Sequence, residues 1–244
     1  NLIKYFLFCI RDKSKFIIVS SFPSSGWNYF NKVINEYINL KNDEKNTENF
    51  LTIDGSAALK NEKLEEYFMM NTHYCFFEIP FFFSGKVTKN YKIIISRNYV
   101  STLYSYYKKY KRVDSFEEFI KNGNSLKRIV DFYNSWSENL VKSEKFEILK
   151  YENLRNEPLK EFKKATNILF NVKINDNDLL QAIEKYDFDL EKKRKIQKKK
   201  TDMDMFMGKN DYSDMIEKKT LNYIRNYLKI NLKKKTIDIF NYEI

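Results

Sequence analysis

Two segments of the chain combine residue types that could bind an anion. Residues 16–30 read Phe-Ile-Ile-Val-Ser-Ser-Phe-Pro-Ser-Ser-Gly-Trp-Asn-Tyr-Phe, an apolar run followed by a turn sequence and a helical pattern. Residues 92–107 repeat this plan, with Arg97 closing the apolar run. A buried strand that turns into a helix points backbone N–H groups and the positive end of the helix dipole at one spot. Two such turns predict a ligand with two separate anionic groups.

The first of these turns is P-loop-like but is not a Walker motif. It lacks the Gly-Lys-Ser/Thr sequence, which disfavours ATP hydrolysis of the usual kind. The remaining anion cradle consists of backbone amides, the hydroxyls of Ser24 and Ser25, and the start of a helix. Pro-Ser-Ser-Gly is also an ordinary turn sequence, so a plain chain reversal is the alternative.

The elements that must position these turns form an alternating pattern. Four apolar runs predict strands, at residues 16–20, 74–79, 92–96 and 146–150. They do not alternate strictly between apolar and polar residues, which is typical of parallel strands covered on both faces. Helical patterns occupy residues 27–40, 100–110, 126–141, 159–170, 176–186 and 212–228. This order predicts a single α/β domain with a central parallel sheet of four to five strands flanked by helices. Ligands are expected at the carboxyl ends of the strands.

Charge and composition restrict the partners. A net charge of +11 suits a polyanion, whether a nucleic acid, an acidic glycan or a phosphate-rich cofactor. Codon bias is an alternative source of this positive charge, because an AT-rich genome also produces an abundance of Lys, Asn, Ile, Phe and Tyr. No apolar run approaches the ~20 residues of a membrane helix. Two cysteines, Cys9 and Cys75, give neither a disulfide framework nor a metal spacing, so we expect a cytoplasmic setting and no metal.

From residue 16 to residue 228, the order of elements resembles the sulfotransferases that use 3′-phosphoadenosine 5′-phosphosulfate (PAPS). Their first loop, Pro-Lys-Ser-Gly-Thr-Thr-Trp, binds the 5′-phosphosulfate. Their Arg-Asn-Pro…Ser-Tyr-Tyr segment, which binds the 3′-phosphate, is similar to residues 97–107. The resemblance implies that the donor is bound by Ser24, Ser25, Gly26, Trp27, Asn28, Tyr29, Arg97 and Ser105.

Three later segments extend the resemblance. Residues 146–158 are similar to the family's Leu-Xaa-Tyr-Glu-Asp-Leu motif, which implies that Tyr151 lies near the nucleoside. Residues 182–188 are similar to a segment that reaches the adenine, which implies this role for Phe188. The family's Arg-Lys-Gly-Xaa-Xaa-Gly-Asp-Trp motif is only partly matched by residues 206–212. It implies phosphate binding by Gly208 and Lys209, without the arginine.

The resemblance also implies a general base. Sulfuryl transfer moves a dispersed negative charge between two oxygens, and a base takes the proton from the acceptor. His73, the only histidine, follows Asn-Thr where the family often has Lys-Thr-His with histidine as the base. A neutral imidazole suits this role. Glu78 is the substitute base, and a histidine without function is the alternative.

Two departures from the family concern charge. Ser24 replaces the loop lysine that helps to neutralise the leaving phosphate oxygen, and Asn71 replaces a second position that is commonly basic. Either another lysine enters the site, from residues 192–200 or as Lys209, or catalysis is weak.

The resemblance therefore predicts a sulfotransferase that acts on a hydroxyl or amine of a carbohydrate or small metabolite and releases PAP. A second hypothesis is a PAP-binding or PAPS-binding relative with weak or no catalysis. The third is a basic nucleic-acid-binding protein, which ranks last because no nucleic-acid-binding module is recognised and arginine is scarce.

Overall fold

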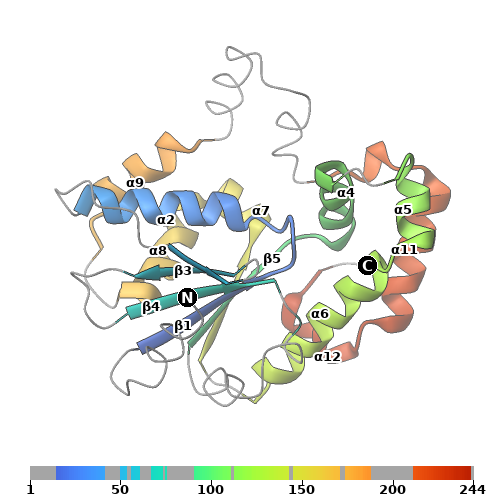
Figure 1. The fold of residues 1–244 in the computed structure, drawn as a ribbon, viewed down its shortest axis with the longest axis horizontal. Coiled ribbons are helices and arrows are strands. Elements are labelled where there is room, and N and C mark those ends of the chain that lie inside the picture. Colours follow the sequence, from blue (N-terminus) through green and yellow to red (C-terminus); the bar gives the residue numbers. More distant parts are fainter. Residues whose placement is uncertain are drawn as a thin grey trace, which may run out of the picture.

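A mixed β-sheet forms the centre of the molecule (Figure 1). The computed structural model describes residues 15–41, 50–53, 56–60, 67–73, 75, 91–110, 113–142, 145–170, 174–187 and 211–242. Within these residues the sheet has six strands in the order β2-β3-β4-β1-β5-β6. The strands are β1 (Lys15–Ser21), β2 (Phe50–Ile53), β3 (Ser56–Lys60), β4 (Tyr67–Thr72), β5 (Tyr91–Ser96) and β6 (Phe146–Lys150).

The four neighbouring strands β4, β1, β5 and β6 are parallel and end level with one another. Ser20 of β1 pairs with Thr72 of β4, and Ser96 of β5 pairs with Lys150 of β6. Strand β1 also pairs in parallel with β5. The residues that follow these four strands therefore emerge along one edge of the sheet, which is where the parallel-sheet hypothesis places a ligand.

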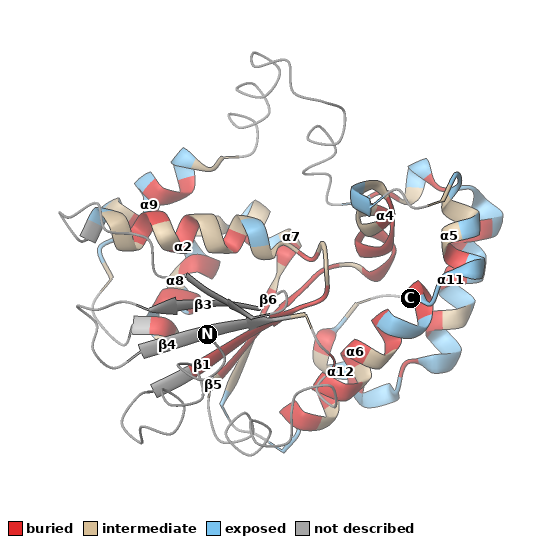
Figure 2. Cartoon of the chain, in the orientation of Figure 1, coloured by how far each residue is buried: buried red, intermediate tan, exposed pale blue. Residues whose placement is uncertain are grey.

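Helices cover both faces of the sheet. One face carries α2 (Trp27–Lys41), α7 (Tyr151–Asn156), α8 (Pro158–Phe170) and α9 (Asp176–Lys185). The other carries α4 (Tyr99–Tyr110), α5 (Phe116–Asn122), α6 (Ser125–Leu140), α11 (Lys218–Asn231) and α12 (Lys234–Phe240). Alternate strand residues enter different cores: Ile93 and Ile95 face α2, whereas Ile94 faces α6. Both faces of β1 and β5 are buried, as Figure 2 shows, which explains the uninterrupted apolar runs.

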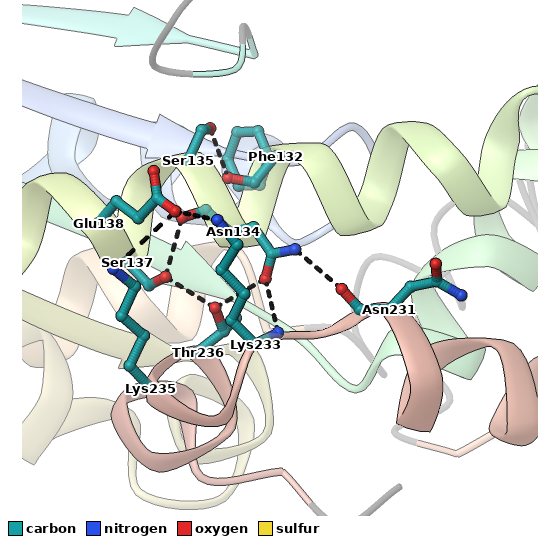
Figure 3. Close-up of polar contacts among 9 residues, drawn as sticks. All are labelled: Phe132, Asn134, Ser135, Ser137, Glu138, Asn231, Lys233, Lys235 and Thr236. Atoms are coloured by element: carbon teal, nitrogen blue, oxygen red, sulfur yellow. Dashed lines mark hydrogen bonds and ion pairs between the residues drawn. The ribbon is translucent and has the colours of Figure 1, made fainter.

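A polar network fixes the C-terminal helices to α6 (Figure 3). The Asn134 side chain donates to the carbonyl of Asn231 at 3.0 Å and accepts from the amide of Lys233 at 3.0 Å. Thr236 of α12 donates to the Asn134 side-chain oxygen at 2.8 Å and shares a 2.7 Å hydrogen bond with Ser137. These contacts set the course of the chain into its last described residues, 241–242.

The predicted elements agree with the structure with a few differences. Strands over 16–20, 92–96 and 146–150 are confirmed, as are the helices over 27–40, 100–110, 126–141, 159–170 and 176–186, with ends shifted by up to one residue. The predicted strand 74–79 lies outside the described residues apart from Cys75. Strand β4, a parallel neighbour of β1, lies just before it in the sequence and was not predicted. The antiparallel strands β2 and β3 were not predicted. The single helix expected over 212–228 is a short 3₁₀ turn, Ser213–Met215, followed by α11.

No helix in the described part of the chain combines the length and apolar character that a membrane span requires.

Candidate active site

The candidate site lies where the chain diverges from two adjacent strands. After β1 the chain enters α2 on one face and continues to β4, whereas after β5 it enters α4 on the opposite face and continues to β6. This topological switch point is where open α/β sheets bind ligands, in the crevice beyond the carboxyl ends of the strands. The two predicted anion-binding turns meet there.

The turn after β1 is tight and strained. The amide of Ser25 donates to the carbonyl of Phe22 at 3.1 Å, and the amide of Phe30 donates to the carbonyl of Gly26 at 3.1 Å. Ser24 and Gly26 have φ values of 69° and 109°. A Cβ atom on Gly26 would stand 2.4 Å from Cδ2 of Tyr151, so only glycine fits there without a shift.

Donor groups suited to an anion remain in this turn. The amides of residues 26–29 lie between the two hydrogen-bonded ones. Gly26 directly precedes α2, and residues 27–29 form its first turn, where N–H groups have no intrahelical partner. The hydroxyl of Ser24 is buried and has no hydrogen-bond partner within the described residues. Because a buried polar group is normally hydrogen-bonded, this hydroxyl fits a turn that receives a polar ligand.

Arg97 joins the second turn to the first. Its side chain is buried, with 3% exposed, and its Nη1 donates to the carbonyl of Ser24 at 3.0 Å. Its guanidinium carbon lies 4.4 Å from the ring centroid of Tyr151 and 5.5 Å from that of Tyr212. The structure therefore brings Ser24, Gly26, Arg97 and Tyr151 into one constellation.

His73 lies at the carboxyl end of β4, next to the same turn. Its Nδ1 is 2.6 Å from the carbonyl oxygen and 3.1 Å from the hydroxyl of Ser21. A carbonyl can only accept, so Nδ1 carries the proton and Nε2 carries the lone pair. Burial lowers the pKa of His73, the hydrogen bond to Ser21 opposes this, and the nearby charges of Lys109 and Arg128 lower it further. The lowered pKa favours the neutral imidazole, with the proton on Nδ1 and the lone pair on Nε2.

The side chains of Trp27, Asn28 and Tyr29, which are expected to bind the donor, differ in their surroundings. Trp27 packs 6.0 Å from the ring of Phe30, and Tyr29 packs edge-on to Phe162 at 5.5 Å, so both side chains join the apolar core beneath α2. Burial raises the pKa of Tyr29 to about 12. Asn28 is exposed. Their backbone amides, rather than their side chains, belong to the turn.

Ser105 lies one helical turn beyond Ser101 on α4 and is half-buried. The hydroxyl of Ser101 accepts from the amide of Tyr212 at 3.3 Å, so this face of α4 contacts the segment that follows residues 206–210. Phe188, Gly208 and Lys209 lie outside the described residues, as do Glu78 and residues 192–200.

Four residues at the site were missed by the sequence analysis. The hydroxyl of Tyr133 accepts from the amide of Arg97 at 3.4 Å, and Tyr212 covers the guanidinium. Glu152 accepts from the backbone amide of Asn98, and Tyr242 hydrogen-bonds to Glu152 and to the side-chain hydroxyl of Ser96, so the pair contacts both neighbours of Arg97. Two of them had a signal in the sequence: Glu152 directly follows Tyr151 in its motif, and Tyr212 ends the partly matched segment 206–212.

Within the described ranges, no group of three or more His, Cys, Asp and Glu side chains is arranged to hold a metal ion.

Fold and site together define an α/β protein with a P-loop-like turn facing a strand-end arginine. The sulfotransferase domain family matches residues 3–244, and the chain belongs to that family. Among solved structures, mouse sulfotransferase SULT7A1 complexed with PAP is similar, with a TM-score of 0.63 and 17% sequence identity over 95% of this chain and 87% of that chain. At this identity the likeness shows the shared fold. The comparison with curated proteins gives no match.

Proposed function

We propose that this protein transfers the sulfuryl group of PAPS to a hydroxyl or amine of a small-molecule or glycan acceptor. The observation that carries the proposal is the convergence of two functions on the segment from Ser21 to Gly26. The carbonyl of Ser21 holds His73 in the tautomer of a base, and the carbonyl of Ser24 holds Arg97 beside an anion-binding turn. Membership in the sulfotransferase family favours such an acceptor over a nucleic acid.

The donor would be held at both of its charged ends. The amides of residues 26–29 and the hydroxyls of Ser24 and Ser25 would bind the 5′-phosphosulfate, and Arg97 with Ser105 would bind the 3′-phosphate. A guanidinium has five N–H donors, so Arg97 can keep its hydrogen bond to Ser24 and still bind a phosphate. The buried Ser24 hydroxyl and the close approach of Tyr151 to Gly26 support this fit.

The remaining donor contacts follow from the family resemblance. Tyr151 would lie along the nucleoside, with Phe188 at the adenine and Gly208 and Lys209 at the 3′-phosphate. Lys209 or another lysine of residues 192–200 would supply the positive charge that Ser24 lacks.

In the chemical step, PAPS supplies the sulfuryl group. Nε2 of His73 takes the proton from the acceptor as the acceptor oxygen or nitrogen bonds to sulfur and the bond from sulfur to the 5′-phosphate oxygen breaks. The hydrogen bond from Nδ1 to the carbonyl of Ser21 would fix the ring orientation and leave the lone pair of Nε2 for the acceptor proton. A positioned base of this kind contributes about 10²–10⁴-fold in rate.

A PAP-binding relative without catalysis is the second candidate, and Ser24 favours it because a hydroxyl brings no charge to the leaving group.

A turnover assay separates the active enzyme from the inactive relative. The purified protein is incubated with ³⁵S-labelled PAPS and a panel of phenols, amines, sugars and glycans, and PAP release is followed in parallel. The proposal expects labelled product with at least one acceptor and none with His73→Ala. Tight PAP binding without product from any acceptor would favour the inactive relative. A cytoplasmic location stays part of the proposal.

A further inference from the structure

Glu152 binds the backbone immediately after Arg97. Its Oε1 accepts from the amide of Asn98 at 2.9 Å. The side chain of Asn98 in turn accepts from the amide of Ser101 at 3.0 Å and so caps α4. The carboxylate of Glu152 therefore fixes the point at which the chain leaves Arg97 and enters the helix.

Tyr242 binds the other oxygen of the same carboxylate. Its hydroxyl donates to Oε2 of Glu152 at 2.9 Å and lies 3.2 Å from the hydroxyl of Ser96. The single proton of Tyr242 goes to the carboxylate, which only accepts, so the hydroxyl of Ser96 donates to Tyr242. Ser96 and Asn98, the two neighbours of Arg97, are thus both linked to Glu152.

The ring of Tyr242 packs against defined neighbours. It packs 5.4 Å from the ring of Tyr99 in an edge-to-face arrangement, and Nζ of Lys150 lies 4.7 Å from its centroid. The same Nζ donates to the carbonyl of Asn241 at 2.7 Å. Asn241 has a φ of 48°, a left-handed conformation that ends α12 and directs the chain back to the strand ends. Burial raises the pKa of Tyr242 well above its usual value, so the hydroxyl keeps its proton.

We infer that Glu152 and Tyr242 are positioning residues that hold Arg97 in the geometry required for the 3′-phosphate of the donor. The inference rests on the proposed function, in which Arg97 binds that phosphate. Tyr151 contacts the guanidinium of Arg97. Glu152, the next residue, binds the amide of Asn98 directly and reaches the hydroxyl of Ser96 through Tyr242, so both neighbours of Arg97 are held. A guanidinium binds phosphate through directed N–H groups, so a small displacement of its backbone weakens that contact.

The test compares two nucleotides that differ only in the 3′-phosphate. Kd values for PAP and for adenosine 5′-phosphate are measured by calorimetry for the wild type, Tyr242→Phe, Glu152→Gln and a control, Tyr223→Phe. Tyr223 is 43% exposed on α11 and takes part in none of the contacts described for Glu152 and Tyr242. Phenylalanine preserves the Tyr242 ring, and the glutamine carbonyl can still accept from the amide of Asn98.

Tyr242→Phe is expected to weaken PAP about tenfold, the change that corresponds to one hydrogen bond, with binding of adenosine 5′-phosphate unchanged. Glu152→Gln should act in the same direction, and the control should match the wild type. Equal weakening of both nucleotides, with a lower urea midpoint, would show a merely structural role and overturn the inference. Unchanged discrimination in both variants would also overturn it.

Failure of the proposed function gives a different result. A wild type that binds PAP no more tightly than adenosine 5′-phosphate would show that Arg97 does not bind the 3′-phosphate. In that case the proposed function and the inference fall together, whereas a wild type that discriminates isolates the test of Tyr242 and Glu152.

Discussion

The guanidinium carbon of Arg97 lies 4.4 Å from the ring centroid of Tyr151, and the two residues directly follow the paired strand ends of β5 and β6. The same tyrosine ring contacts Gly26 across the turn after β1. Three parallel strands therefore deliver one residue each to a single constellation. A cation over an aromatic ring contributes about 0.5–2 kcal/mol, more when water is excluded, as it is here.

Arg97→Ala should abolish most of the affinity for PAP. Loss of a hydrogen-bonded charge costs about 1.5–3 kcal/mol, roughly a 10- to 100-fold increase in Kd. The measurement is the thermal shift caused by PAP, which at about 100 Kd reflects roughly 2.7 kcal/mol in the wild type. Arg97→Lys should recover part of the shift, because it keeps the charge without the planar fork.

The matched control for Arg97 is Arg225→Ala on the exposed side of α11. It removes one positive charge away from the site and should leave the PAP shift at its wild-type size. Similar losses in both variants would indicate that PAP responds to net charge alone.

Gly26→Ala should destabilise the protein by two separable effects. The positive φ costs a residue with a Cβ roughly 1–3 kcal/mol, and the contact with Tyr151 adds to it. Urea unfolding of a double-mutant cycle separates them, because Tyr151→Ala removes the contact and leaves the backbone strain. The cost of Gly26→Ala should shrink in the Tyr151→Ala background. An equal cost in both backgrounds would mean that the two residues do not touch.

Activity should fall at low pH with a midpoint below 6.5, the ordinary pKa of histidine, because burial lowers the pKa of His73. Protonation of Nε2 removes the base, so kcat/KM falls as pH drops through the lowered pKa. Because the chain has a single histidine, its imidazole ring gives a single set of NMR signals, whose titration reports this value directly. A midpoint above 6.5, or a His73→Ala variant with full activity, would exclude this residue as the base.

The same shift affects stability. In the unfolded state His73 is protonated near pH 6.5, whereas in the folded state it is protonated only at lower pH. The free energy of unfolding therefore decreases as pH falls from about 6.5 toward the lowered pKa. His73→Gln should flatten this part of the pH profile.

Lys92 provides an independent test at alkaline pH. It is fully buried in β5, and burial lowers its pKa to about 8 from the ordinary 10.5. Between these values the unfolded state binds more protons, so the free energy of unfolding should rise with pH. Urea unfolding at about pH 7.5 and about pH 9.5 measures the slope, which Lys92→Met should remove. A wild type and variant with parallel profiles would contradict the assignment.

The sequence predicted the parts of the fold that depend on local pattern. The isoleucine runs of β1 and β5 indicate strands buried on both faces, and the spacing of apolar residues in α6 indicates its buried stripe. Strand β4 reads Tyr-Phe-Met-Met-Asn-Thr, which is less typical of a strand than the apolar run that follows it. Its pairing with β1 is a long-range property that no local pattern reports.

In the candidate site, too, the residues in local motifs could be predicted and those placed by long-range contacts could not. Arg97, Gly26 and Tyr151 could be predicted because each follows a recognisable strand within a motif. Tyr242 could not, since it is one of 18 tyrosines and its contacts with Ser96 and Glu152 depend on how α11 and α12 return to the sheet. Tyr133 lies in a stripe that predicts packing, and only the tertiary structure directs its hydroxyl to the amide of Arg97.

The most direct measurement is a crystal structure of the protein with PAP. We expect the 5′-phosphate at the backbone amides of residues 26–29 and the 3′-phosphate within hydrogen-bonding distance of the guanidinium of Arg97. A nucleotide bound at another edge of the sheet, or one phosphate bound without the other reaching Arg97, would contradict the proposed donor site.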